Sequence, residues 1–146
     1  MINDVYTAIY TLLAKDEQLV KMLASFQGAP AIVTAPEIPY ELWKEYPAIF
    51  IRAEHTSDMD TLATREMRAV FKIEVYARRT PSVTALQSIA DRVYEVLHHH
   101  IPVALNKTYI YGWVCSGPSA ASPYDMLSEC DTQSVTLTTF VQFLFL

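Results

Sequence analysis

Three consecutive histidines, His98, His99 and His100, form the group in this sequence most suited to binding a metal ion. Imidazole is the commonest protein ligand for transition metals. The residues before this run follow a helical pattern, however, and consecutive residues of a helix are turned by about 100° from one another. Three such side chains cannot converge on one ion from a regular helix. The run is instead typical of a polar helix C-terminus, where partial positive charge is favourable.

Acidic residues between two predicted strands are a second candidate for chemistry. Glu54, Asp58 and Asp60 lie close together in the sequence, and such carboxylates could bind a cation or act as an acid and base pair. Their spacing shows neither burial nor convergence, so an acidic solvated hairpin is the favoured interpretation. The sequence also contains no GxGxxG or GxxxxGKS/T motif that could hold nucleotide phosphates. We therefore predict no catalytic residue, no metal ligand, no cofactor and no enzymatic activity.

The two cysteines, Cys115 and Cys130, do not form a metal-binding pattern. They have no CxxC spacing, and the sequence contains no further cysteines to complete a zinc site. A disulfide between them is geometrically possible but is disfavoured in a cytosolic product.

The charge balance argues against an open phosphate-binding surface. With 11 basic and 16 acidic residues, the chain has a formal net charge of -5. Four arginines nevertheless gather around one predicted strand, and acidic residues flank them. Salt bridges between subunits are therefore favoured over contacts with nucleic acid. These arginines are Arg65, Arg68, Arg78 and Arg79.

Helical periodicity predicts three helices that would position these residues. Apolar residues recur at helical spacing over residues 4–14, and Asp16 then restarts the pattern as the N-cap of a short second helix. Thr80 and Pro81 are suited to open the longest helix, which would end near residue 99. One apolar stripe of this helix is predicted to form the core together with one face of a strand; the predicted core residues are Phe71, Ile73, Val75, Leu86, Ile89, Val93 and Leu97. Between the second and third helices, residues 29–47 contain four prolines and are predicted to form an ordered loop.

Alternating apolar and polar residues predict four strands. In the clearest one, Phe71, Ile73 and Val75 point one way while Lys72 and Glu74 point the other. Residues 55–67 are polar and are predicted to form a flexible hairpin arm between the first two strands. The predicted strands are residues 48–54, 68–78, 108–116 and 133–145.

Length and composition predict one packed domain over residues 1–146. The 146 residues are 51% hydrophobic and 18% charged, which excludes a disordered chain. The element order predicts an α+β fold in which a mainly antiparallel four-stranded sheet has helices packed on one face. The other face would be unusually apolar, which favours self-association. Its candidate residues are some combination of Phe50, Tyr76, Phe140 and Leu144, together with an aromatic-rich strand around Tyr109, Tyr111 and Trp113.

Three segments resemble a known family: VYTAIYTLLAKDEQLVKML, EYPAIFIR and RAVFKIEVYARRTPSVTALQSIADRVYEVLHH. Their order and spacing are similar to those of the tail-terminator or tail-completion proteins of long-tailed bacteriophages and related prophage elements. In that family, a helix with a D-x-x-L break, here beginning at Asp16, leads through a Pro-rich loop to a P-x-I/V-x-I strand, here beginning at Pro47. A V-x-V-x-A/S strand, here beginning at Ile73, then leads to a helix over residues 85–97.

The resemblance implies a structural protein of the virion tail, present in the host cytoplasm during assembly. Members of the family form a ring, usually a hexamer, at the head-proximal end of the tail tube. There they end tube polymerisation and provide the surface that joins the tail to the head. The implied partners are other copies of the chain, the tail tube protein and a head-tail connector or neck protein. DNA would pass through the bore without specific binding, and no membrane is involved.

A ring would also give the arm over residues 55–67 a role. Its apolar residues would be exposed in a monomer, and the nearest large apolar surface in a ring is the neighbouring subunit or the docked tube. The residues predicted to form this interface are Asp58, Met59, Leu62, Arg65, Met67, Arg78 and Arg79.

Two other functions stay open from the sequence. The first is another phage neck or tail component, such as a head-completion or tube-like protein built on a similar small unit. The second is a cytosolic metal-dependent enzyme or ligand-binding domain that uses a metal near the histidine run.

Overall fold

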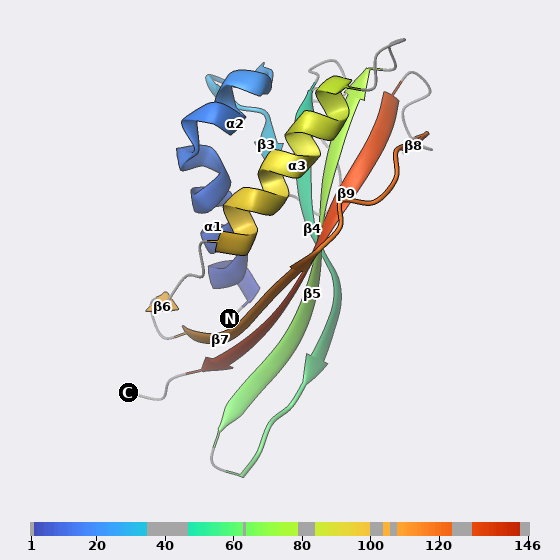
Figure 1. The fold of residues 1–146 in the computed structure, drawn as a ribbon. Helices are drawn as coiled ribbons and strands as arrows, with labels where there is room; N and C mark the ends of the chain where they lie inside the picture. The colour runs from blue at the N-terminus through green and yellow to red at the C-terminus, as the bar shows by residue number, and fades with distance from the viewer. Residues whose placement is uncertain are drawn as a thin grey trace.

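The computed structural model of the protein describes residues 2–34, 47–62, 64–78, 84–99, 104–105, 108–123 and 130–143. Within these ranges the helices are α1 (Ile2–Lys15), α2 (Glu17–Met22) and α3 (Thr84–His99) (Figure 1). The long strands are β4 (Ala48–Asp58), β5 (Arg65–Arg78), β7 (Thr108–Ser116) and β9 (Cys130–Phe143). The short strands are β1 (Ser25–Phe26), β2 (Ala29–Pro30), β3 (Ile32–Val33), β6 (Ala104–Leu105) and β8 (Ser122–Pro123).

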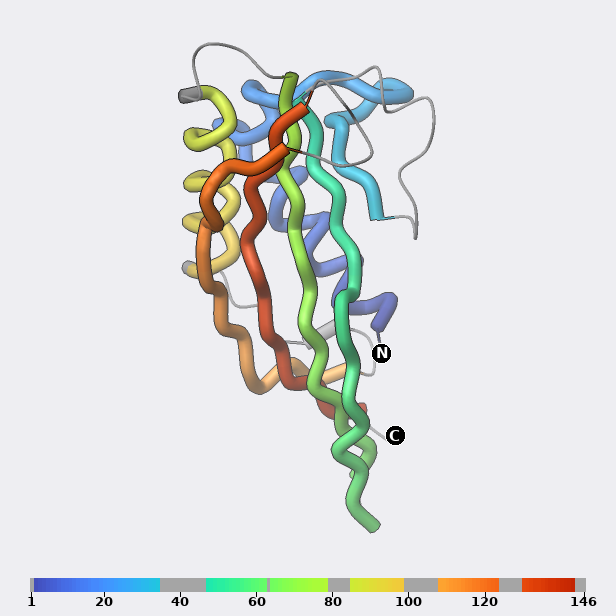
Figure 2. Tube along the Cα trace, turned by 90° about the vertical axis from the view of Figure 1, so that its right-hand side faces the viewer, coloured from blue at the N-terminus to red at the C-terminus, as the bar shows by residue number. Residues whose placement is uncertain are grey.

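The predicted four-stranded, mainly antiparallel sheet with helices packed on one face is wrong. Among the described residues, six strands run in the order β3-β4-β5-β9-β7-β6, and β8 pairs with β9. Strands β3 and β4 are parallel, so the sheet is mixed, and β1 and β2 form a separate two-stranded sheet. The additional strands have two residues each, which is too short to produce an alternating pattern in the sequence. Figure 2 shows the four long strands side by side.

Asp16 separates the first two helices, as predicted. Its carboxylate caps α2 by accepting a hydrogen bond of 2.9 Å from the backbone N–H of Leu19. The same carboxylate accepts hydrogen bonds from the guanidinium of Arg92 in α3, at 2.8 Å from Nε and 2.6 Å from Nη2. These hydrogen bonds and the charge of Asp16 raise the pKa of Arg92. One side chain therefore both starts α2 and joins it to α3.

The main core lies between α1, α3 and the sheet. Helix α3 packs against β5, β7 and β9, while α1 packs against α2 and α3. Tyr6 of α1 meets the ring of Phe71 edge to face at 5.1 Å, and its hydroxyl accepts a hydrogen bond of 2.7 Å from the N–H of Ala53. All the residues predicted to form the sheet–helix core are buried there, which confirms their register. They are Phe71, Ile73, Val75, Leu86, Ile89, Val93 and Leu97.

A second, smaller apolar cluster lies outside the main core. Phe50 of β4 and Tyr76 of β5 are buried in it, and Phe26 of β1 packs against it. The sequence predicts Phe50 and Tyr76 on an apolar face that is available for self-association. In the structure, other residues of the same chain cover both side chains. Phe140 is half-buried, and Leu144 lies outside the described residues.

Strand β7 changes the face it presents to the core partway along its length. The sequence predicts one face that carries Tyr109, Tyr111, Trp113 and Cys115, opposite Ile110 and Val114. The pairing with β9 shifts by one residue between Ile110 and Gly112, so that Ile110 and Trp113 both face the core. A Cβ atom at Gly112 would lie 2.6 Å from the ring of Phe140, so glycine allows this close approach. Tyr109, Tyr111 and Val114 are left exposed.

Candidate functional site

The hairpin of β4 and β5 extends beyond the helices and forms the lower end of the molecule in Figures 1 and 2. We call its residues 55–62 and 64–67 the arm. The sequence predicts a flexible excursion here, but β4 continues to Asp58 and β5 begins at Arg65. Residues 55–58 of β4 are polar on both faces, so the alternation that marks a strand in the sequence is lost there.

Backbone pairing continues almost to the tip of the arm. The N–H of Met59 donates to the carbonyl of Glu66 at 2.9 Å, and the N–H of Thr61 donates to the carbonyl of Thr64 at 2.9 Å. The carboxylate of Asp60 accepts a further hydrogen bond of 2.9 Å from the N–H of Glu66. These bonds give the arm a defined shape although it has no helix over it.

The tip of the arm exposes apolar side chains. Leu62 is fully exposed, and Met59 is 41% exposed. Asp58, Asp60 and Arg65 are exposed around them. An apolar residue presented to water beyond the body of the protein is a feature of contact surfaces.

The structure places most of the predicted interface residues on the arm and one of them, Arg78, at the other end of β5. Asp58, Met59, Leu62 and Arg65 lie together at the arm. Met67 is also on the arm, but only 7% of its surface is exposed, and it packs against the main core. Arg78 is exposed at the opposite end of β5, about 40 Å from Arg65 at the usual rise of a strand. Arg79 lies outside the described residues.

Two acidic residues near the predicted arginine group, Glu66 and Glu74, contact side chains of the same chain. Glu74 forms salt bridges with Arg52 at 3.0 Å and with Lys72 at 3.5 Å. The carboxylate of Glu66 accepts a hydrogen bond of 3.3 Å from the hydroxyl of Tyr111. Burial and the negative charge of Glu66 raise the pKa of Tyr111. The arm is therefore connected to the edge of β7.

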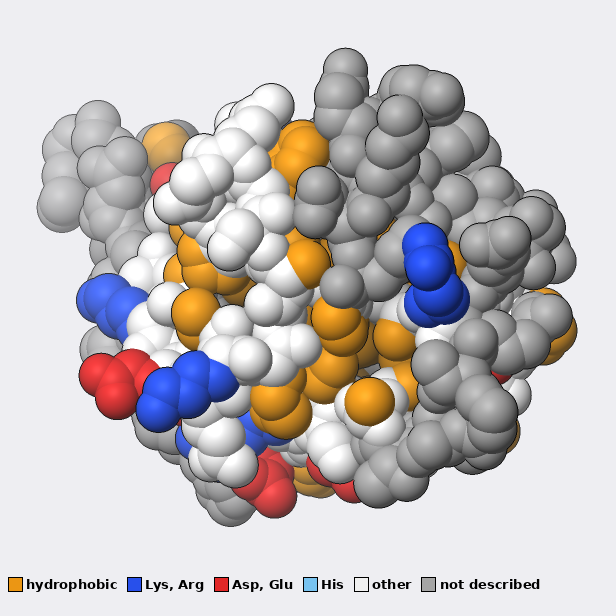
Figure 3. Space-filling model, turned by 90° about the horizontal axis from the view of Figure 1, so that it is seen from above, with side chains coloured by type: hydrophobic (Ala, Val, Ile, Leu, Met, Phe, Trp, Pro, Cys, Tyr) orange, Lys and Arg blue, Asp and Glu red, His pale blue; other side chains and the backbone are white. Residues whose placement is uncertain are grey.

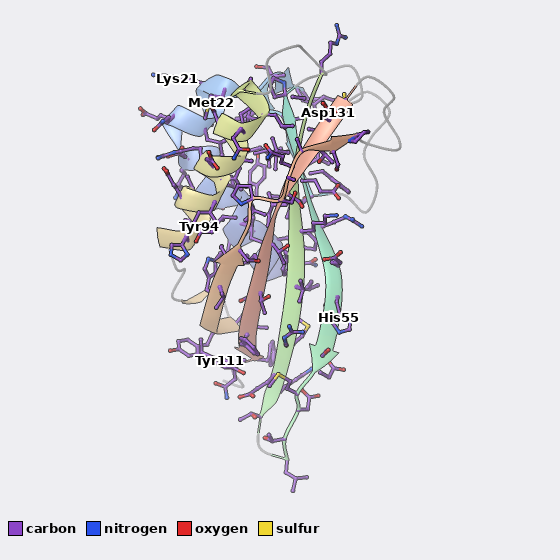
Figure 4. The ribbon with its side chains drawn as sticks, turned by 45° about the vertical axis from the view of Figure 1, so that its right-hand side comes forward. Lys21, Met22, His55, Tyr94, Tyr111 and Asp131 are labelled. Carbon is purple, nitrogen blue, oxygen red and sulfur yellow. The ribbon has the colours of Figure 1, made fainter. Side chains whose placement is uncertain are left out.

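Exposed side chains on β7 form a second apolar surface. The sequence indicates its two tyrosines but also includes Trp113, which the structure buries, and not Val114. Tyr109 and Tyr111 are 41% and 44% exposed, and Val114 is 60% exposed. Tyr111 lies 6.0 Å from Phe140 between ring centroids, and Figure 4 shows it near the lower end of the sheet. The sequence pattern placed Val114 on the opposite face from the tyrosines, and the register shift brings the three residues together.

The structure describes the side chain of His98 alone within the histidine run. The ring of His98 stacks on that of Tyr94 at 5.0 Å, while the side chain of His99 and all of His100 lie outside the described residues. No group of three or more His, Cys, Asp or Glu within the described ranges could hold a metal ion. Figure 4 shows Tyr94 and His55 on different elements at different heights of the molecule.

The two cysteines are poor nucleophiles in this setting. Both are buried, and they form no disulfide with each other. Burial raises the pKa of the Cys115 thiol to about 11, so the thiol stays protonated near neutral pH. This environment is typical of a packing residue.

The fold is similar to that of a protein chain in a solved structure of the virion of a native gene transfer agent (GTA) particle. The TM-score is 0.67 with 16% sequence identity, and the match covers 97% of this chain and 96% of that chain. No protein-family model and no curated protein sequence matches the chain. None of the described helices is long and apolar enough to span a membrane. The near-complete coverage shows that the two chains share their fold from end to end.

Proposed function

We propose that this protein is a structural component of a phage-like virion and acts as a tail terminator. In this role it forms a ring, with six copies expected, at the head-proximal end of the tail tube. The ring ends tube polymerisation and offers the surface that joins the tail to the head. The observation that carries the proposal is the similarity of the whole fold to a chain of a gene transfer agent virion. The sequence resemblance to tail terminators supports the more specific role.

The exposed arm supports an assembly role. Leu62 and Met59 lie at the tip of a hydrogen-bonded hairpin, where their apolar surface is in contact with water. Contact with a neighbouring subunit or with the tail tube protein would remove that surface from water, which favours association. The proposed partners are therefore further copies of the chain, the tail tube protein and a head-tail connector or neck protein.

The charge of the chain suits a ring around DNA. A formal net charge of -5 per subunit disfavours adhesion of a negatively charged polymer to the ring. DNA would pass through the bore without specific binding. The proposed role requires no catalytic residue and no cofactor, and it places the protein in the virion and, during assembly, in the host cytoplasm.

A second candidate is another neck or tail component, such as a head-completion or tube-like protein. The similarity to a virion chain favours it equally, because a shared fold does not specify a position in the particle.

The experiment combines mass measurement with tail capping. Light scattering of the purified protein should give the mass of a closed ring, either alone or after addition of tail tubes. Electron microscopy should then show the protein at one end of the tubes, and tube length should stop increasing when it is added. Binding along the tube wall, or a protein that stays monomeric with tubes present, would contradict the terminator role. Binding to heads instead of tubes would favour the second candidate.

A variant with a shortened hairpin tests whether the arm is needed for tube capping while the rest of the fold is kept. Replacing residues 57–64 by a short Gly-Ser turn shortens the hairpin and leaves the main core intact, apart from the end next to Met67. We expect a folded protein with unchanged helix content that does not cap tubes. Capping at the normal rate would show that the arm is not part of the interface.

A further inference from the structure

An apolar groove lies at the end of the molecule opposite the arm. It is formed where α2 ends, β4 begins and the first turns of α3 pass, and its volume is about 350 Å³. Its lining residues are Met22, Pro47, Ala85, Ser88 and Ile89. Figure 3 views this end and shows hydrophobic side chains gathered there. This volume is at the lower end of the range for clefts that bind small ligands, roughly 300–1,000 Å³, so a few apolar side chains would fill it.

The arm of the same chain cannot reach this groove. Strand β5 is 14 residues long, and it separates the tip from the end of the molecule that carries the groove. A strand of this length spans about 45 Å. A groove and an exposed apolar tip at opposite ends of the chain can therefore meet only between two copies.

We propose that the groove receives the tip of the arm of a second copy. Leu62, which is fully exposed, would enter between Met22 and Ile89, and Met59 would cover the rim. Both sides of this contact are apolar, so the contact gains free energy by removing both from water.

The charged residues next to Met59 on the arm and next to Met22 at the groove have opposite signs. On the arm, Asp58 and Asp60 flank Met59, and both are exposed. At the groove, Lys21 is exposed next to Met22, as Figure 4 shows at the end of α2. Opposite charges at the rim of an apolar contact favour the correct orientation and increase the association rate.

The contact joins two different surfaces, so each copy offers one free tip and one free groove. Such head-to-tail contacts build a ring when the rotation between successive copies closes, and an open filament when it does not. This inference deepens the proposed function, on which it rests for its role in the tail, by naming the surfaces through which the ring closes.

Disulfide trapping tests this contact directly. Protein with Leu62→Cys is mixed with ¹⁵N-labelled protein carrying Ser88→Cys, at a concentration where light scattering detects association, and mild oxidant is added. Mass spectrometry identifies the mixed dimer by its mass. The matched control replaces Ser88→Cys by Ser116→Cys, at another exposed serine, which lies outside both the groove and the arm. The native cysteines do not interfere, since both are buried.

The expected result is a yield of the Leu62–Ser88 dimer at least about tenfold above that of the control pair, because a specific contact raises the effective concentration of the two thiols. Equal yields from the two pairs would overturn the proposal, as would a protein that stays monomeric at every concentration with no excess of the mixed dimer. The result is independent of tail capping. Specific trapping without capping would reject the terminator role and keep the contact, whereas capping without specific trapping would reject the contact and keep the role.

Discussion

The body and the arm of this protein are built from the same two strands but are stabilised in different ways. In the body, β4 and β5 carry buried side chains such as Ile51 and Ile73, and helices cover them. In the arm the same strands are held mainly by backbone hydrogen bonds, and the largest side chain at the tip, Leu62, is exposed. The body therefore accounts for the stability of the fold. The arm contributes little to stability and is free to contribute to association.

This difference predicts opposite responses to mutation. A change in the body should lower the free energy of unfolding and affect assembly only through loss of folded protein. A change at the tip should leave unfolding almost unchanged and affect assembly directly.

The largest effect is expected at the centre of the body. Phe71 is completely buried and contacts the ring of Tyr6. Replacing Phe71→Ala leaves a cavity and should lower the free energy of unfolding by about 3–5 kcal/mol, measured by urea denaturation. Val70→Ala, one residue away on the opposite face, is the control and should cost much less. Equal losses for both variants would show that the assignment of the buried face is wrong.

Thiol reactivity compares the two regions without changing stability. Burial raises the pKa of Cys115 to about 11, whereas a cysteine introduced by Leu62→Cys would be fully exposed. At about pH 8 the buried thiol should be ionised on the order of 100-fold less than an ordinary thiol, and burial also blocks the reagent. Labelling with a chromogenic disulfide reagent should therefore show one fast thiol in Leu62→Cys and none in the native protein. Fast labelling of the native protein would mean that the body opens readily.

A polar contact of the body should have an intermediate effect. Asp16→Ala removes the N-cap of α2, which should cost about 0.5–2 kcal/mol of unfolding free energy. Asp16→Asn keeps a capping oxygen but loses the charge that faces Arg92. The asparagine variant should therefore be the more stable of the two in urea denaturation. If the two variants were equally destabilised, the ion pair rather than the cap would be the main contribution.

The body was largely predictable from the sequence because its elements have one buried face. Phe71, Ile73 and Val75 alternate along β5, and Ile89 and Val93 follow the helical period of α3, so each pattern identifies both the element and its buried side. The break at Asp16 was also predictable, since its side chain has a local partner three residues away.

The arm and the exposed edge were less predictable because their structure depends on pairing with other strands. Residues 55–58 continue β4 because β5 lies beside them, although their own sequence is polar on both faces. Along β7, the extra residue near Tyr111 is visible only in the register with β9. The groove lined by Met22 and Ser88 combines segments far apart in the sequence, so no local pattern could indicate it.

The smallest effect on stability, and the sharpest test of the comparison, is expected at Leu62. Its side chain is fully exposed, so Leu62→Ser removes no buried contact of the folded chain and should change the free energy of unfolding by less than about 0.5 kcal/mol. If the tip contacts a second copy or the tail tube, the same change should nevertheless weaken ring formation and tube capping, measured by light scattering and electron microscopy. Lys15→Ser, at an exposed residue of α1 outside the arm, the groove and the apolar surface of β7, is the control and should assemble normally. If Leu62→Ser assembles like the control, the interface lies on the body and not on the arm. The body and the arm would then differ only in how much they contribute to stability.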